Sequence, residues 1–265
     1  MKKIVTTIII SLFLSFTIKA DDLESKSIGL VLSGGGVKGF GHIGTLQLID
    51  SLNIKIDYVV GSSIGAITAA LYATGHSVDE IKHIAATTNW DEVFSSSRKR
   101  NHLYYFQKKD ADKYQLSFSI NKLKPIPPIS LSSGQYSYEH LSNIFINYSN
   151  SPDYDDLIIP FRCNATDIIT GNEVVFNNGS IAKALRISTS IPTVFTPIED
   201  NGNLLVDGGL VNNLPTNLAE DLGADFIIAS SVLSGEKSKN EIKDIFGVVS
   251  RIINLYGIKN ERNNI

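Results

Sequence analysis

Cysteine is almost absent from this chain of 265 residues, in which Cys163 is the only one. A single cysteine cannot form a disulfide within the chain, and no cysteines and histidines stand at the spacing of a metal site. Because Cys163 ends the apolar stretch 157–163, we predict a buried structural thiol. The sequence therefore predicts neither a disulfide framework nor a metal centre.

A large net charge is also missing, since the formal value is −3. This mildly acidic balance argues against nucleic acid as a general partner. With 43% hydrophobic and 19% charged residues, the composition is typical of a globular chain. The length suits one sizeable α/β domain and is short for two.

The first twenty residues differ from the rest of the chain. A basic start precedes the apolar stretch 4–16, and the small residue Ala20 follows it. This layout is typical of a secretory signal peptide over residues 1–20. A membrane anchor is the alternative, but the apolar stretch is short for a span and is interrupted by Thr and Ser. We therefore expect cleavage near Ala20 and export of one domain covering 21–265.

Apolar strands alternate with helical segments through most of that domain. This alternation predicts an α/β fold with three layers, in which a mostly parallel central sheet has helices on both faces. The expected strands are 28–32, 54–60, 157–163, 173–176, 204–206 and 225–229. The expected helices are 40–52, 66–73, 77–87, 138–148, 181–186, one around 215–220, and 241–255.

These signals weaken over residues 89–149, which we interpret as an irregular insertion near the site. Basic residues, aromatic residues and prolines are interleaved there, and 115–120 alternates like an exposed strand. Such a mixture suits contact with an anionic lipid surface. A solvated charge cluster in a loop is the other interpretation.

One serine stands in a context that suggests chemistry. Ser63 is the centre of Gly61-Ser-Ser-Ile-Gly65, between the expected strand 54–60 and the expected helix 66–73. Strand, sharp turn and helix around G-x-S-x-G is the context that a nucleophile elbow requires. The two glycines allow close backbone approach, and the serine lies at the positive end of the helix. Ordinary turn chemistry is the alternative, but the context favours a nucleophile.

A glycine-rich loop, 33–39, follows the first expected strand. Gly34, Gly36 and Gly39 satisfy the dinucleotide-binding fingerprint, but the same loop could form an oxyanion hole from its backbone N–H groups. A dinucleotide site needs an acid at the far end of the second strand, whereas Asp57 lies near that strand's beginning. Because both loops leave the carboxyl ends of parallel strands, they can face one crevice, which favours an acyl-transfer site.

The base that would activate Ser63 is not a late histidine, because none follows His140. The usual order of serine, acid and histidine therefore cannot be built with a late acid. His42, near the start of a helix, is expected to pack or cap. Asp207 follows the strand 204–206, precedes two glycines and could accept the serine proton directly. Its pKa, ordinarily about 3.9, would have to rise through burial, or oxyanion stabilisation would have to supply most of the rate. An ordinary turn is the alternative for Asp-Gly-Gly.

With these three motifs in this order, the chain resembles the patatin-like phospholipases over about residues 27–235. The motifs are Ser33-Gly-Gly-Gly-Val-Lys-Gly39, Gly61-Ser-Ser-Ile-Gly65 and Asp207-Gly-Gly209, with accessory stretches at 41–44, 186–192 and 212–215. The resemblance implies that Ser63 is the nucleophile and Asp207 the base, without a histidine. It further implies oxyanion donors in Gly34, Gly35 and Gly36, and supporting roles for Lys38, Gly61, Gly65, Gly208 and Gly209.

The implied reaction is hydrolysis of phospholipids or related acyl esters through an acyl-serine intermediate. The resemblance implies no metal or organic cofactor. The signal-peptide pattern and the general character of the sequence are similar to bacterial exported members. The alternative is a catalytically inactive relative that binds lipids or a surface. The presence of both Ser63 and Asp207 argues against it, because an inactive copy would be free to lose either.

Overall fold

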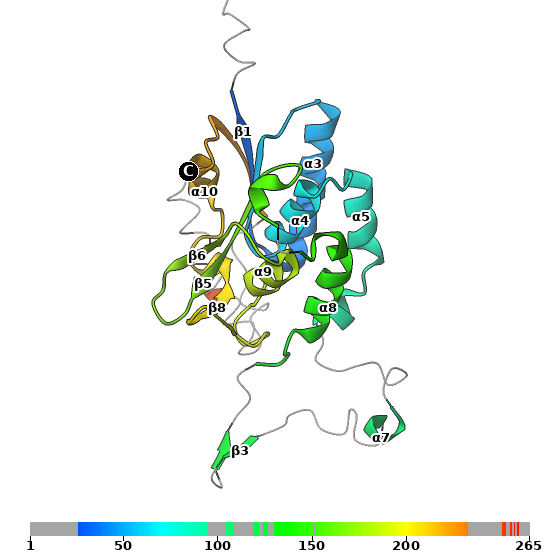
Figure 1. The fold of residues 1–265 in the computed structure, drawn as a ribbon, viewed down its shortest axis with the longest axis vertical. Helices are drawn as coiled ribbons and strands as arrows, with labels where there is room; N and C mark the ends of the chain where they lie inside the picture. The colour runs from blue at the N-terminus through cyan, green and yellow to red at the C-terminus, as the bar shows by residue number, and fades with distance from the viewer. Residues whose placement is uncertain are drawn as a thin grey trace, which may run out of the picture.

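The computed structural model describes residues 26–94, 104–108, 119–121, 124–126, 130–150 and 152–232, together with 251, 252, 255, 257 and 259. Within them, a seven-stranded sheet has the order β7-β8-β5-β2-β1-β9, and β6 also pairs with β5. Of these strands, β1, β5, β6 and β8 are labelled in Figure 1. Its strands are β1 (Ile28–Leu32), β2 (Tyr58–Gly61), β5 (Phe161–Asp167), β6 (Glu173–Phe176), β7 (Ile198–Asp200), β8 (Asn203–Asp207) and β9 (Phe226–Ser230). The predicted signal peptide lies outside the described residues.

The sheet is parallel on one side and antiparallel on the other. β1 lies between β2 and β9, parallel to both, and β2 is parallel to β5. β5 then pairs antiparallel with β6 and β8, and β7 pairs antiparallel with β8. The sequence predicted the parallel part, and the antiparallel edge is a feature that only the structure reveals.

Helices cover both faces of this sheet, as the sequence predicted. Leu30 and Leu32 of β1 contribute to the large apolar core, whereas Val31 between them packs with Leu214 and Leu218 on the other face. This alternation follows from the two-residue period of a strand. The large core holds helices α3 (His42–Ser51), α4 (Ile64–Ala73), α5 (Val78–Thr87), α8 (Gln135–Ile144) and α9 (Ile181–Ser188), and the other face holds α10 (Thr216–Asp221).

Several elements have the boundaries that the sequence predicted. β1 and β6 match residue for residue, and α5 begins with a capping box in which Ser77 and Glu80 bond to each other's backbone N–H. The Ser180 side chain caps α9 by accepting from the N–H of Lys183.

No helix in the described ranges is both long and apolar enough to cross a bilayer.

Two expected strands begin four residues later than predicted. Ile54 belongs to the end of α3, because its N–H bonds to the carbonyl of Ile49 after Asn53 adopts a φ of 52°. This cap uses an apolar residue that the sequence pattern assigned to β2. β5 begins only after Pro160, which has no N–H for a ladder, and it continues through buried polar residues to Asp167.

Some helices also differ from their predicted limits. The segment predicted as a helix from residue 40 starts as a 3₁₀ helix, η1 (Gly36–Gly41), before α3. The helix predicted over 138–148 is α8, which ends at Ile144 and is followed by the 3₁₀ helix η3 (Ile146–Tyr148). Of the predicted helix 241–255, only 251, 252 and 255 lie within the described residues.

Besides α8 and η3, the described part of the insertion contains short elements. They are α6 (Trp90–Phe94), α7 (Tyr105–Lys108) and an antiparallel pair of β3 (Ser119–Asn121) and β4 (Lys124–Ile126). Most of the strand predicted over 115–120 lies outside the described residues. The remaining 3₁₀ helices in the described ranges are η4 (Tyr154–Asp156) and η5 (Gly208–Leu210).

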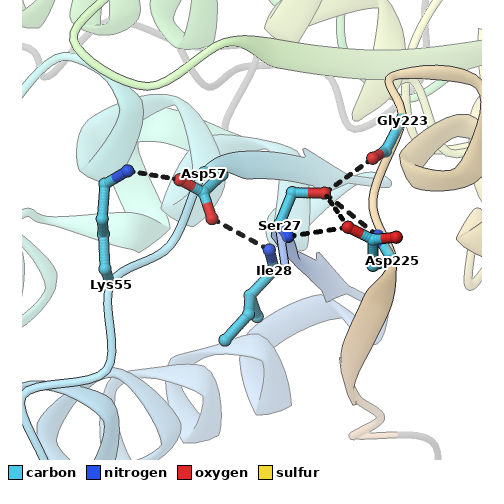
Figure 2. A network of polar contacts seen from close by, with 6 residues as sticks. All are labelled: Ser27, Ile28, Lys55, Asp57, Gly223 and Asp225. Carbon is cyan, nitrogen blue, oxygen red and sulfur yellow. Dashed lines mark hydrogen bonds and ion pairs between the residues drawn. The ribbon is translucent and has the colours of Figure 1, made fainter. Parts of the chain in front are cut away.

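The amino ends of β1, β2 and β9 are held together by side chains (Figure 2). The Asp57 carboxylate accepts from the N–H of Ile28 at 2.9 Å and from Lys55 Nζ at 2.6 Å. On the other side of β1, Ser27 donates through Oγ to the carbonyl of Gly223 and through its N–H to Asp225. Asp57 is thus a structural residue at the end of β2 opposite to Ser63.

We expect Asp57→Ala to lower the free energy of unfolding by about 1–2 kcal/mol, because a partly buried N–H loses its acceptor. Burial acts to raise the pKa of Asp57, but the hydrogen bonds from Lys55 and Ile28 outweigh it and hold that pKa below its usual value. The stabilisation is therefore present above about pH 4 and is lost as the pH falls through the folded-state pKa.

Urea unfolding at neutral and at acidic pH measures this effect. Lys55→Ala is the matched control, since its side chain is 86% exposed and removal of such a partner should change stability little. A loss in Asp57→Ala that is equal at both pH values would contradict the assignment.

Candidate active site

A sharp turn between β2 and α4 holds Ser63. Ser63 has φ 52° and ψ −126°, a sparsely populated conformation for a residue with a side chain. A Cβ on Gly61 would collide with the backbone of Gly65 and Ala66, and one on Gly65 would collide with the carbonyl of Leu32. Both glycines are therefore needed for the backbone to pass this closely, and the strained turn directs the serine away from the strand.

Two hydrogen bonds hold Ser63, whose side chain is buried. Its Oγ donates to Oδ2 of Asp207 at 2.6 Å, and its backbone N–H donates to Oγ of Ser188 at 3.0 Å. The first bond is short, as expected where a hydroxyl meets a carboxylate. The structure thus places the predicted serine and the predicted aspartate in direct contact.

Asp207 is buried at the end of β8. Burial raises its pKa to about 6, and hydrogen bonds from Ser63 and from the N–H of Gly209 oppose this rise. The second of these bonds, from Gly209 to Oδ1, is 2.8 Å long. The carboxylate can therefore accept a proton much closer to neutral pH than an exposed aspartate could.

The register of the sheet explains how residues so distant in sequence meet. Gly61 of β2 pairs with Cys163 of β5, and Asp207 of β8 pairs with Ala165 on the same strand. Ser63 is two residues beyond Gly61, as Ala165 is two beyond Cys163, so Ser63 and Asp207 lie at the same level of the sheet. The antiparallel register of β8 on β5 brings Asp207, the last residue of β8, to this level.

Close packing also explains the glycines after Asp207. A Cβ on Gly208 would collide with Asn164, and one on Gly209 would collide with the side chain of Asn213. Because neither glycine has a Cβ, the turn after β8 can pack against Asn164 of β5 and against Asn213.

The glycine-rich loop needs one correction to its predicted donors. The N–H of Gly34 donates to the carbonyl of Asn213 at 3.1 Å, and the Asn213 side chain donates to the carbonyl of Gly34. Gly34 is thus a structural link, and its N–H is not available to an oxyanion. The N–H groups of Gly35 and Gly36 have no hydrogen-bond partner within the described ranges. Gly36 has a φ of 59°, which glycine adopts without strain.

The neighbouring Lys38 is exposed, in the 3₁₀ helix η1. Its predicted supporting role stays a prediction.

His42 is fully buried and joins the same loop to β9. Its Nε2 donates to the carbonyl of Ser33 at 2.8 Å, so Nδ1 is left to accept from Ser230 Oγ at 2.9 Å. Burial lowers the pKa of His42, which keeps the ring neutral. Both ring nitrogens are engaged in structural bonds, in agreement with the packing role that the sequence predicted.

An apolar pocket opens beside Ser63 between η1, α4 and the part of the insertion that forms α6 and α8. Besides Ser63 it is lined by Gly36, Val37, Phe40, Ile64, Ile67, Trp90, Val93, Ser137, His140, Leu141, Thr189 and Ile191. The serine therefore faces a cavity that suits a hydrocarbon chain more than a polar ligand.

Cys163 is fully buried in β5, and burial raises the pKa of its thiol. This confirms the prediction of a structural cysteine. In the part of the chain that the structure describes, no three His, Cys, Asp or Glu side chains gather as a metal site would require.

Comparison with known proteins assigns this arrangement to a family. Residues 30–220 match the family model described as patatin-like phospholipase. The chain belongs to the patatin-like phospholipase family. Neuropathy target esterase sws of Drosophila melanogaster is 34% identical over 212 residues, which are 79% of this chain and 13% of that protein.

Lysophospholipase NTE1 of Phaeosphaeria nodorum is 30% identical over 79% of this chain and 12% of its own length. The chain thus spans a small part of the curated relatives it matches. Among solved structures, VipD from Legionella pneumophila aligns over 72% of this chain and 47% of that chain, with 16% identity and a TM-score of 0.45.

In this patatin-like domain, sequence reasoning missed the residues that support the dyad. Ser188 Oγ accepts a hydrogen bond from the N–H of Ser63. The Asn213 carbonyl accepts from the N–H of Gly34, and the Asn213 side-chain amide donates to the carbonyl of Gly34. Arg186 is buried and donates to the carbonyls of Ser133 and Gly134, which ties α9 to the start of α8. All three lie in stretches that carry the family resemblance, but only their contacts reveal a role.

Proposed function

We propose that the chain is a lipid acyl hydrolase in which Ser63 is the nucleophile and Asp207 the base. The observation that carries this proposal is the 2.6 Å hydrogen bond from Ser63 Oγ to Asp207 Oδ2, at the mouth of an apolar pocket. Membership of the patatin-like phospholipase family supports it, as do the names of the relatives, an esterase and a lysophospholipase.

The first half of the reaction forms an acyl-enzyme. Asp207 takes the proton of Ser63 as Oγ attacks the ester carbonyl, and the N–H groups of Gly35 and Gly36 stabilise the negative oxygen. When the tetrahedral intermediate collapses, the ester C–O bond breaks and Asp207 returns the proton to the departing alcohol. The acyl group is left on Ser63.

The second half releases the acid. Water attacks the acyl carbonyl, Asp207 accepts a proton from this water, and the fatty acid leaves as the bond to Ser63 breaks. The proton held by Asp207 returns to Oγ. The raised pKa of Asp207 supports both directions of proton transfer near neutral pH.

We further propose that the chain is an exported member of the bacterial type, with a signal peptide over residues 1–20 and a patatin-like domain over 21–265. The basic start, the apolar stretch and Ala20 support export. Contact with a membrane surface is supported by Val37, which lines the pocket although its side chain is 68% exposed.

Mass spectrometry of the protein purified from the cells that express it would show whether Asp21 is the new amino terminus. An uncleaved chain would contradict export through a cleaved signal peptide.

Labelling with a fluorophosphonate probe tests the proposed reaction. We expect one adduct on Ser63 after peptide mapping, together with hydrolysis of a fluorogenic phospholipid by the same preparation. Ser62→Ala is the matched control, because Ser62 is an adjacent, fully buried serine, and it should label as the unchanged protein does. A folded protein that neither labels nor hydrolyses the lipid would support the alternative, a non-catalytic lipid-binding relative.

A further inference from the structure

A second apolar cavity lies behind the pocket at Ser63. We call the pocket at Ser63 the near pocket and this second one the far cavity. The far cavity is lined by Phe40, Ile43, Ile64, Ile67, Thr68, Leu71, Ile81, Ile84, Ala85, Trp90, His140, Leu141 and Ile144. It extends between α3, α4, α5 and α8, away from the serine.

The two cavities share one wall. Six residues line both, and they are Phe40, Ile64, Ile67, Trp90, His140 and Leu141. A hydrocarbon chain that entered at Ser63 would therefore meet this wall before it could reach the far cavity.

Trp90 is the central aromatic ring of the wall. Its ring centroid lies 4.9 Å from that of Phe40 and 6.2 Å from that of His140, so it packs beside both rings. The indole N–H donates to the carbonyl of Ala85 at 2.8 Å, which fixes the orientation of the ring. Trp90 is thus the largest side chain of the wall, and it is held in place by a hydrogen bond as well as by packing.

We propose that Trp90 limits the length of the acyl chain that the near pocket accepts, by closing the passage to the far cavity. The proposal rests on the proposed function, since it assigns the near pocket to the acyl group of the substrate. An acyl chain in the near pocket ends at the indole ring, and a longer chain gains nothing from the far cavity while the ring is in place.

The proposal predicts the shape of a chain-length series. Each buried methylene contributes a factor of about 4 in kcat/KM, the equivalent of its transfer free energy. For p-nitrophenyl esters from butyrate to palmitate, kcat/KM should rise by this factor per methylene and then level off at a break. The break marks the chain length that reaches Trp90.

Trp90→Ala should move this break to longer chains, because removal of the indole joins the near pocket to the far cavity. Trp90→Leu keeps an apolar side chain of intermediate size, and it should move the break less and in the same direction. It keeps the test decisive if Trp90→Ala does not fold, as judged by circular dichroism.

Ile144→Ala is the matched control. Ile144 lines only the far cavity, so this change enlarges the far cavity but leaves the wall intact, and the break should not move. A break at the same ester in the folded Trp90 variants and in the unchanged protein would overturn the role of Trp90. A break that moves equally in Ile144→Ala would also overturn it. If the unchanged protein hydrolyses none of the esters and the probe does not label it, the failure lies in the proposed function instead.

Discussion

Ser63→Ala should lower kcat for phospholipid hydrolysis by about 10⁴- to 10⁶-fold, the range seen when a nucleophile acting with its base is removed. The substitution deletes Oγ, the only atom of the residue that donates to Asp207 and the only one that could form the acyl-enzyme. It should leave the strained turn in place, because alanine carries the same Cβ as serine. Steady-state hydrolysis of a fluorogenic phospholipid measures the loss.

Stability measurements separate this loss from unfolding. The variant leaves Oδ2 of buried Asp207 without its donor, so we expect the free energy of unfolding to fall by about 1 kcal/mol near neutral pH. A folded Ser63→Ala protein that keeps a tenth of the activity would show that Ser63 is not the nucleophile. Labelling at another serine would then identify the replacement.

Asp207→Asn should lower kcat by about 10²- to 10⁴-fold, the usual contribution of a general base. The amide is nearly the same size as the carboxylate and can keep both contacts, because its oxygen can accept from Gly209 and its nitrogen can donate to Ser63. It cannot take the serine proton. In the unchanged protein, kcat/KM should rise with pH and level off above about pH 6, because burial raises the pKa of Asp207 to about 6. The Asp207→Asn variant should not show this rise of kcat/KM with pH.

The same substitution should make the protein more stable at neutral pH. The pKa of Asp207 is raised in the folded state, so the folded protein holds its proton more tightly than the unfolded chain does. The stabilisation is present below the unfolded pKa and is lost as the pH rises through the folded one. The amide that replaces the carboxylate does not ionise, and the gain at neutral pH should be at most roughly 3 kcal/mol.

Urea unfolding of both proteins at neutral pH and near pH 4 measures this gain, which should disappear at the lower value. If the variant is less stable than the unchanged protein at neutral pH, burial of the carboxylate is not the dominant effect. A catalytic loss without a stability gain would keep Asp207 as the base but remove the explanation for its raised pKa.

Short-range patterns account for what was predicted well. β1 was recognisable because an apolar run ends at a glycine loop, and α5 because Ser77 and Glu80 form a capping box. Boundaries were wrong where an apolar residue serves a neighbouring element. Ile54 caps α3 instead of opening β2, and the polar end of β5 is buried, which its composition does not reveal.

The supporting contacts of the site could not be predicted in the same way. Gly34 and Asn213 are 179 residues apart, and their double contact removes Gly34 from the oxyanion donors. His140 lies in the insertion, where sequence signals are weak, and becomes a wall of the pocket only because α8 packs there. No local sequence feature of Gly34 or of His140 indicates which distant segment it contacts.

The elements that carry the chemistry follow from local sequence patterns. The order of strand, glycine-rich turn and helix places Ser63 on an elbow, and the absence of a late histidine leaves Asp207 as the base candidate. The contact of these two side chains at 2.6 Å, although they are 144 residues apart, depends on long-range packing. The antiparallel pairing of β8 with β5 brings Asp207 to this level of the sheet, and burial there raises its pKa. The physical reason is that the conformation of a turn depends on neighbouring residues, whereas strand direction, register and desolvation depend on packing among segments that are distant in the chain.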